Sequence, residues 1–157
     1  MQKNFQKTLN DKVELSGIGL HNGIKVNLRL LPAPEDHGIV FKRVDIDSNK
    51  IEANYQNVSA PVLCTKIKNK EGATVSTVEH LMAAFYGEEI DNVLVEIDAP
   101  EIPIMDGSAN EFVEAIRSVG TKKQDTLKKF IKVLKKVEFK DGEKFISIEP
   151  LERDLVI

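Results

Sequence analysis

The stretch from Ser76 to Gly87 repeats apolar residues at helical spacing, and a helix with one apolar stripe packs against a core. Ser76 is expected to cap its N-terminus, and Gly87 to follow the last apolar turn as a terminating glycine. The stripe consists of Val78, Leu81, Met82 and Phe85. The sequence therefore predicts a short helix lying on a hydrophobic core.

Glu79 and His80 stand side by side in the first turn of this helix. Ser76 and Glu79 have the spacing of a capping box, and a carboxylate at a helix N-terminus is favourable by a few tenths to about 1 kcal/mol. His80 fits a structural role less well, because the helix dipole favours the neutral imidazole, which is the form that ligates metal. From these residues alone, a structural cap and a metal or acid–base site both remain open.

The composition excludes several classes of protein. A chain of 157 residues fits one ordinary domain, or one small domain plus a piece of another. Its hydrophobic content of 41% and charged content of 30% indicate a globular protein. A net charge of −3 argues against nucleic-acid binding, which needs a concentrated basic face. Lysines crowd the last third; we interpret them as the solvated face of strands, with contact to anionic phosphate or lipid headgroups as the alternative.

Cys64 is the single cysteine, so no disulfide framework and no cysteine-rich metal site is expected. We interpret it as a small buried thiol. The first residues lack the apolar region of a signal peptide, and no apolar run is long enough to span a bilayer. The sequence therefore predicts a cytoplasmic, reduced protein without an integral membrane segment.

Short strands separated by turns make up most of the rest. A hairpin is predicted from the strand that begins at Gln6 and runs to Leu15, the glycine-rich turn 16–23 with His21 near its tip, and the alternating strand Ile24–Leu30. A loop is predicted over 45–57. Further strands are predicted at Gly38–Arg43, Val58–Asn69 and Asp91–Asp98.

After these strands, prolines and Gly107 stiffen the loop 99–108, so Asp106 is expected to be held rigidly. Ser108 and Glu111 have the spacing of a second capping box, before a helix that Gly120 closes. Residues 121–126 are polar and are interpreted as a linker. The strand Phe130–Phe139, the turn Asp141-Gly142 and a returning strand at 145–148 then form a hairpin. A lone hairpin is marginal in water, so the chain is expected to end inside a second domain, or to dimerise through this unpaired hairpin.

Three stretches carry a resemblance to a known family: Gly17–Gly23, Ser76–Leu81 and Ile90–Ala109. They closely resemble the zinc-dependent UDP-3-O-acyl-N-acetylglucosamine deacetylases of lipid A synthesis, and they occur in the family's order. The resemblance extends from about Gln6 to Pro150. It corresponds to the N-terminal half of a family member plus the opening strands of its C-terminal half.

The resemblance implies an α+β fold of two similar domains, each a sheet covered by helices, with the active site between them. Residues 1–122 would form the first, two-layer domain with the Glu-His motif. Residues 123–157 would be the opening strands, a β-hairpin, of an incomplete second domain.

The resemblance also implies a mechanism, in which bound Zn²⁺ activates water to attack the N-acetyl group of the UDP-sugar. Glu79 would be the general base, His80 a zinc ligand and Asp106 a supporting acidic group. The implied substrate-side residues are His21, Val62, Leu63, Cys64 and Thr65.

The sequence also departs from the family pattern. Family members supply two further zinc ligands and a histidine general acid from the second domain, and their His-Lys-x-x-x-Asp motif is absent here. A catalytic zinc takes three protein ligands, and His21 and His37 lie in segments that the family does not use for zinc. This chain alone is therefore expected to be inactive and to bind zinc weakly or not at all. The alternative is a non-catalytic sugar-nucleotide-binding or scaffold domain of the same fold.

Overall fold

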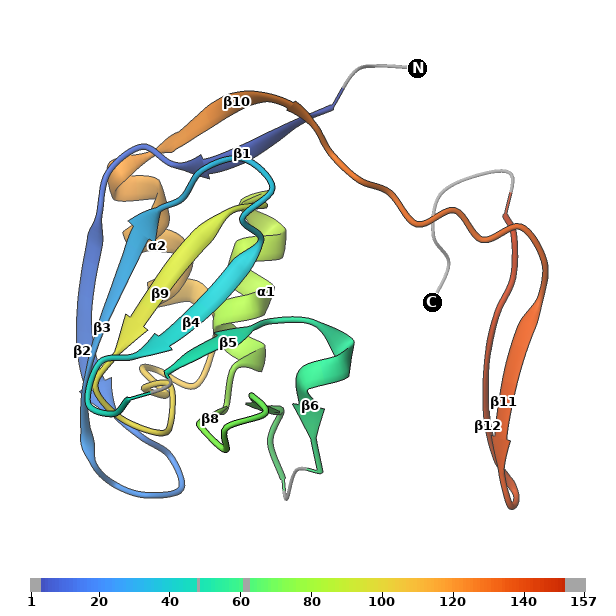
Figure 1. Ribbon diagram of the computed structural model, residues 1–157, viewed down its shortest axis with the longest axis horizontal. Helices are drawn as coiled ribbons and strands as arrows, with labels where there is room; N and C mark the ends of the chain where they lie inside the picture. The colour runs from blue at the N-terminus through green and yellow to red at the C-terminus, as the bar shows by residue number, and fades with distance from the viewer. Residues whose placement is uncertain (1–3, 48, 61–62, 152–157) are drawn as a thin grey trace.

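The computed structural model describes residues 4–47, 49–60 and 63–151 as an α+β protein (Figure 1). Its main sheet has the strand order β2-β3-β9-β4-β5. β4 and β9 run parallel, and the other neighbours run antiparallel. The strands are β2 (Val13–Ile18), β3 (Lys25–Pro32), β4 (Ile39–Arg43), β5 (Lys50–Glu52) and β9 (Val93–Ile97).

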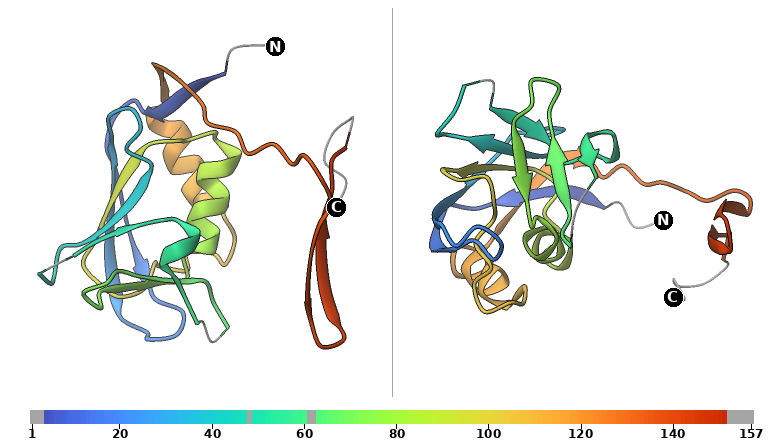
Figure 2. Two further views of the ribbon diagram at one scale, coloured as in Figure 1. Left: turned by 45° about the vertical axis from the view of Figure 1, so that its right-hand side comes forward. Right: turned by 90° about the horizontal axis from the view of Figure 1, so that it is seen from below.

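The helices α1 (Glu79–Gly87) and α2 (Asn110–Val119) pack side by side on one face of this sheet, giving two layers (Figures 1 and 2). β3 alternates buried and exposed residues, as a strand with one face on a core does. Phe41 from the sheet meets Phe85 and Phe112 from the helices in the core, and all three are fully buried. Burial of each such ring contributes roughly 1.5–3 kcal/mol. Neither helix of the described residues has the length and apolar character to cross a membrane.

The outer face of the sheet holds an ion cluster across three strands. Glu96 on β9 accepts hydrogen bonds from the Arg29 guanidinium, whose Nε lies at 3.1 Å, and from the Lys42 ammonium at 2.9 Å. The Glu96 side chain is only 9% exposed. The hydrogen bond from Arg29, and then that from Lys42, hold the pKa of Glu96 below its ordinary value.

This lowered pKa predicts an acid-dependent loss of stability. The ionised Glu96 stabilises the fold above the pKa of an unfolded glutamate, about 4.3, and the stabilisation disappears as the pH falls through the lower folded pKa. Glu96→Gln should therefore reduce the difference in unfolding free energy between about pH 7 and about pH 3. Urea titrations at the two pH values measure it. Glu71→Gln, in an exposed turn, is the control, and equal pH dependence in both variants would contradict the prediction.

A second, three-stranded sheet leads into α1. It consists of β6 (Val58–Ser59), β7 (Lys66–Lys68) and β8 (Thr74–Ser76), in that order. The single strand predicted over 58–69 is therefore wrong, because β6 and β7 are separate. Cys64 lies between them and is half-buried rather than buried. The predicted loop 45–57 contains β5 and a short 3-10 helix, Tyr55–Asn57.

The predicted helix caps are wrong. Ser76 ends β8, and its hydroxyl donates to the Pro100 carbonyl at 3.2 Å instead of capping α1. The N-cap is Val78, which provides no side-chain hydrogen bond. Gly87 is the last helical residue, and the turn with positive φ follows at Glu89.

The second capping box is wrong as well. The N-cap of α2 is Ala109, whose side chain makes no hydrogen bond to the helix. The Ser108 hydroxyl accepts from the Asn110 N–H at 3.0 Å, but the reciprocal bond from Glu111 is absent among the described residues. Gly120, with φ 76°, closes α2 as predicted.

The polar segment predicted to be a linker is a strand. β10 (Thr121–Leu127) pairs antiparallel with β1 (Phe5–Leu9), and together they form a ribbon at one end of the main sheet (Figure 1). Polarity suggested a loop, but the backbone ladder and the Gln124 amide hold this segment in place. The division of the chain at residue 122 stays a prediction.

The C-terminal hairpin projects away from this body (Figures 1 and 2). It consists of β11 (Val137–Asp141) and β12 (Lys144–Ile148), joined by the predicted turn. The strand predicted from Phe130 begins only at Val137. Register places four apolar side chains on one face, each between 53% and 70% exposed: Val137, Phe139, Ile146 and Ile148.

Candidate functional site

The start of α1 is clamped to the loop that precedes β7. The first helical residue, Glu79, is half-buried, and its Oε2 accepts the N–H of Thr65 at 3.0 Å. The Val78 N–H donates to the Thr65 carbonyl at 3.3 Å. Glu79 Oε1 has no hydrogen bond to any described residue, so this oxygen can accept a proton or a further hydrogen bond.

His80, the next residue, is half-buried rather than sealed in the core. Asp106 is exposed and near enough for its charge to interact with His80. Asp106 Oδ1 accepts hydrogen bonds from the Ser108 N–H at 2.9 Å and the Ser108 hydroxyl at 2.8 Å. These two bonds, and to a smaller degree the charge of His80, hold the pKa of Asp106 below its ordinary value. An ionised carboxylate therefore lies within electrostatic range of the imidazole at neutral pH.

A third carboxylate, Glu101, joins the elements around this helix start. It is 1% exposed. Its Oε1 accepts from the N–H of His21 at 3.0 Å and from the Thr77 hydroxyl at 2.8 Å, and its Oε2 accepts from the N–H of Asn22 at 3.1 Å. The turn containing His21 and the residue two before Glu79 are thereby tied to one side chain.

A glycine is required at position 19, because the backbone there lies close to the side chains of Asn22 and Glu101. A Cβ at this position would lie 2.4 Å from Asn22 Oδ1 and 2.6 Å from Glu101 Oε2. The His21 side chain is exposed, and among the described contacts His21 contributes its backbone N–H. The predicted substrate role of its imidazole stays a prediction.

Three of the remaining predicted substrate-side residues, Leu63, Cys64 and Thr65, lie on the loop that meets Glu79. Leu63 is 90% exposed with φ 60°, Cys64 is half-buried, and Thr65 bonds Glu79 through its backbone. Val62 lies outside the described residues.

Comparison with known proteins identifies the chain. The family model described as LpxC, UDP-3-O-acyl N-acetylglycosamine deacetylase, matches residues 6–157. The chain belongs to this family. Three proteins named UDP-3-O-acyl-N-acetylglucosamine deacetylase are similar to it. That of Shewanella denitrificans is 45% identical over 94% of this chain and 49% of its own length, that of Aliivibrio fischeri 47% over 92% and 48%, and that of Pseudoalteromonas atlantica 46% over 92% and 48%.

These comparisons confirm the resemblance drawn from the sequence motifs. The chain spans about half the length of the curated deacetylases it matches. The three motifs meet in space, since Ser76 and Glu101 form one β-bridge and Gly19 and Pro103 another. The family's motifs therefore converge on the start of α1.

A metal site in this LpxC chain is incomplete among the described residues. Within residues 4–47, 49–60 and 63–151, no group of three or more His, Cys, Asp or Glu side chains could hold a metal ion. His80 fits as one ligand, because it is half-buried at a helix N-terminus and makes no side-chain hydrogen bond to a described residue.

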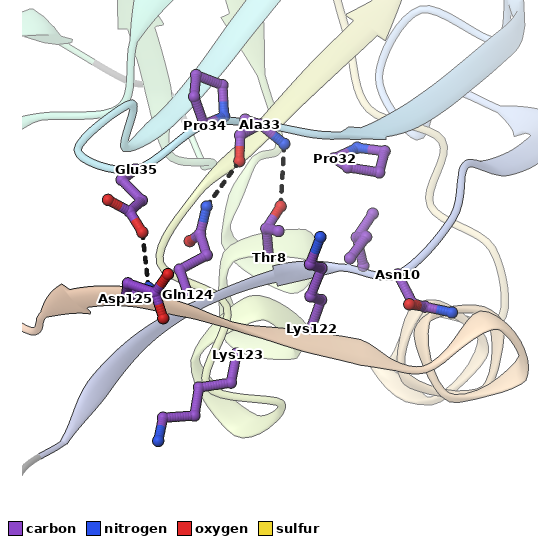
Figure 3. A pocket seen from close by; sticks show the side chains of 11 residues that line it. Thr8, Asn10, Pro32, Ala33, Pro34, Glu35, Lys122, Lys123, Gln124 and Asp125 are labelled. Carbon is purple, nitrogen blue, oxygen red and sulfur yellow. Dashed lines mark hydrogen bonds between the residues drawn. The ribbon is translucent and has the colours of Figure 1, made fainter.

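A separate groove lies at the other end of the chain, where the β1–β10 ribbon meets the end of β3 (Figure 3). Its polar groups bond one another: Gln124 Nε2 donates to the Ala33 carbonyl at 3.0 Å, and the Ala33 N–H donates to the Thr8 hydroxyl at 2.9 Å. Glu79 and His80 do not line it. The groove is thus no part of the candidate site.

Sequence reasoning missed Glu101 and Thr77, although both lie in the quoted motifs. The available signal was a glutamate between prolines in an otherwise apolar run, residues 99–105. Such a glutamate is either exposed or buried against donors, and here it is buried.

Proposed function

We propose that this chain is the Glu-His half of a zinc-dependent deacetylase that hydrolyses the N-acetyl group of UDP-3-O-acyl-N-acetylglucosamine, the committed step of lipid A biosynthesis. The observation that carries the proposal is the pairing of Glu79 and the half-buried His80 at the start of α1 in an LpxC family member. Glu79 Oε1 and the His80 imidazole make no hydrogen bond to the part of the chain that the structure describes. The single cysteine agrees with the reducing cytoplasm as its location.

Each side chain of the candidate site has a separate role. His80 would hold the zinc through an imidazole nitrogen, with the other ligands coming from outside the described residues. When bound, the zinc lowers the pKa of a water toward about 7 and polarises the amide carbonyl. Glu79 takes the proton of the attacking water at Oε1, while the Thr65 N–H holds Oε2 in place. The carbon–nitrogen bond then breaks as the proton held by Glu79 Oε1 passes to the leaving nitrogen, which releases acetate and the amine.

Asp106 supports the imidazole by its charge, since its carboxylate stays ionised beside His80. The exposed Leu63 offers an apolar contact for the acyl chain. Acetate release from UDP-3-O-acyl-N-acetylglucosamine by the complete reading frame that encodes this chain, supplied with Zn²⁺, tests the proposal. Absence of turnover would overturn it.

The 157-residue chain by itself should show no turnover and no stoichiometric zinc. A catalytic zinc needs three protein ligands, and the described residues offer His80 as one. Metal analysis after dialysis against Zn²⁺ measures this. One tightly held zinc per chain would contradict the expectation.

A non-catalytic sugar-nucleotide-binding or scaffold domain is the second candidate, favoured by the incomplete ligand set. It predicts that the complete reading frame binds the UDP-sugar without releasing acetate. Calorimetric titration beside the acetate assay separates the two functions.

The chain by itself should also self-associate through its hairpin. An antiparallel pair of β11 strands centred on Phe139 places Glu138 of one copy opposite Lys140 of the other and joins the two apolar faces. Sedimentation equilibrium should show a dimer whose fraction increases with protein concentration. Ile146→Lys, on the apolar face, should abolish it, whereas Ser147→Lys, on the opposite face, should not. A wild-type chain that stays monomeric at its highest attainable concentration would refute the prediction.

A further inference from the structure

Glu101 is an unusual residue to bury, because its bonding partners among the described residues are all uncharged. They are two backbone N–H groups and one hydroxyl, and Glu101 forms no ion pair with a described residue. Burying a carboxylate costs free energy that neutral donors offset only when all are well placed. A glutamine would keep one acceptor oxygen and turn its amide group toward other donors. The site therefore requires a carboxylate.

The residue held by this carboxylate is itself strained. Thr77 has φ 57°, a left-handed conformation that is costly for a β-branched residue. It is the last residue before the N-cap of α1. The hydrogen bond from the Thr77 hydroxyl to Glu101 Oε1 helps keep Thr77 in that conformation. The conformation of Thr77 sets the direction in which the chain passes from β8 into α1, and therefore the positions of Glu79 and His80.

The backbone around Glu101 reinforces the arrangement. The Ser76 N–H donates to the Pro100 carbonyl and the Ile102 N–H donates to the Ser76 carbonyl, both at 3.0 Å. On the other side, the Ile104 N–H donates to the Ile18 carbonyl at 3.0 Å. The segment 100–104 thus lies between the start of α1 and the turn that contains His21, and the same segment leads on to Asp106.

We propose that Glu101 is a positioning residue for Glu79 and His80, acting through the left-handed Thr77 and through the turn at His21. This inference rests on the proposed function and deepens it. Glu101 touches neither substrate nor metal in this role. It fixes where the general base and the zinc ligand stand relative to the loop of Thr65 and to Asp106.

The first test uses the 157-residue chain and needs no activity. In Glu101→Gln, the His21 and Asn22 amides should lose hydrogen-exchange protection, and the His80 imidazole resonance should shift or broaden. Glu114→Gln, an exposed change on α2, should leave all three unchanged. An unaltered His80 resonance in Glu101→Gln overturns the proposal, whether or not the protein proves to be a deacetylase.

The second test uses the complete reading frame. Glu101→Gln should lower kcat by about 10- to 100-fold, because a misplacement of about 1 Å is enough for that, while KM changes less than about 3-fold. Thr77→Val should act in the same direction and combine with Glu101→Gln less than additively, and Thr77→Ser, which keeps the hydroxyl, should retain most of the rate. Thr77→Val remains informative if Glu101→Gln fails to fold. A wild-type kcat in a folded Glu101→Gln or Thr77→Val enzyme overturns the inference, whereas an inactive wild type with a displaced His80 resonance overturns only the proposed function.

Discussion

Glu79→Gln in the complete reading frame should lower kcat for deacetylation by at least about 100-fold, since a positioned general base contributes roughly 10² to 10⁴. Glutamine keeps an oxygen that can accept the Thr65 N–H, so the clamp at the start of α1 should survive. The variant should therefore unfold at nearly the wild-type temperature. The expected signature is lost catalysis in a stable protein, measured by acetate release and thermal unfolding.

His80→Ala completes this experiment. Removing a zinc ligand should abolish both turnover and bound zinc, as the ligand count falls below what a catalytic zinc needs. His37→Ala is the matched control, because His37 is also half-buried and its imidazole bonds the carbonyl of the neighbouring Gly38. If Glu79→Gln keeps wild-type kcat, the role assigned to Glu79 is wrong and Glu79 is a structural clamp alone. If His80→Ala keeps its zinc, the role assigned to His80 is wrong.

The sequence predicted the elements whose apolar periodicity is strong. The stripe of α1 and the alternation of β3 follow directly from burial of one face, and both occur where expected. The caps were wrong because a Ser-x-x-Glu spacing also arises where a strand runs straight into a helix. At Ser76 the carbonyl of Pro100, distant in sequence, takes the hydroxyl.

The local sequence pattern did not predict the ribbon of β1 and β10. β10 is polar in composition, and its place is fixed by a partner strand more than 100 residues earlier in the chain. Glu101 was missed for the same reason, because its donors come from the turn at His21 and from Thr77. The adjacency of Glu79 and His80, in contrast, is local, so the sequence could place them together.

Asn92, in the motif Ile90-Asp91-Asn92, holds several segments of the fold together. Asn92 is 2% exposed. Its Nδ2 donates to the Oε1 atoms of Gln6 and Gln124, and its Oδ1 accepts from the Gly38 N–H, each at 2.8 Å. One amide therefore joins β1, β10 and the turn before β4. This network was outside the reach of sequence reasoning, because its members are spread over the whole chain.

Asn92→Ala should destabilise the chain by about 2–4 kcal/mol, since it leaves several buried polar groups without partners at about 1–3 kcal/mol each, with incomplete additivity. Urea unfolding followed by circular dichroism measures the change. Asn110→Ala, which loses one exposed bond to Glu114, should cost less than about 1 kcal/mol. Hydrogen exchange should show the loss first in β10, because Gln124 loses one of its two side-chain anchors. Equal destabilisation by the two variants would contradict the prediction and would mean that water replaces the Asn92 amide.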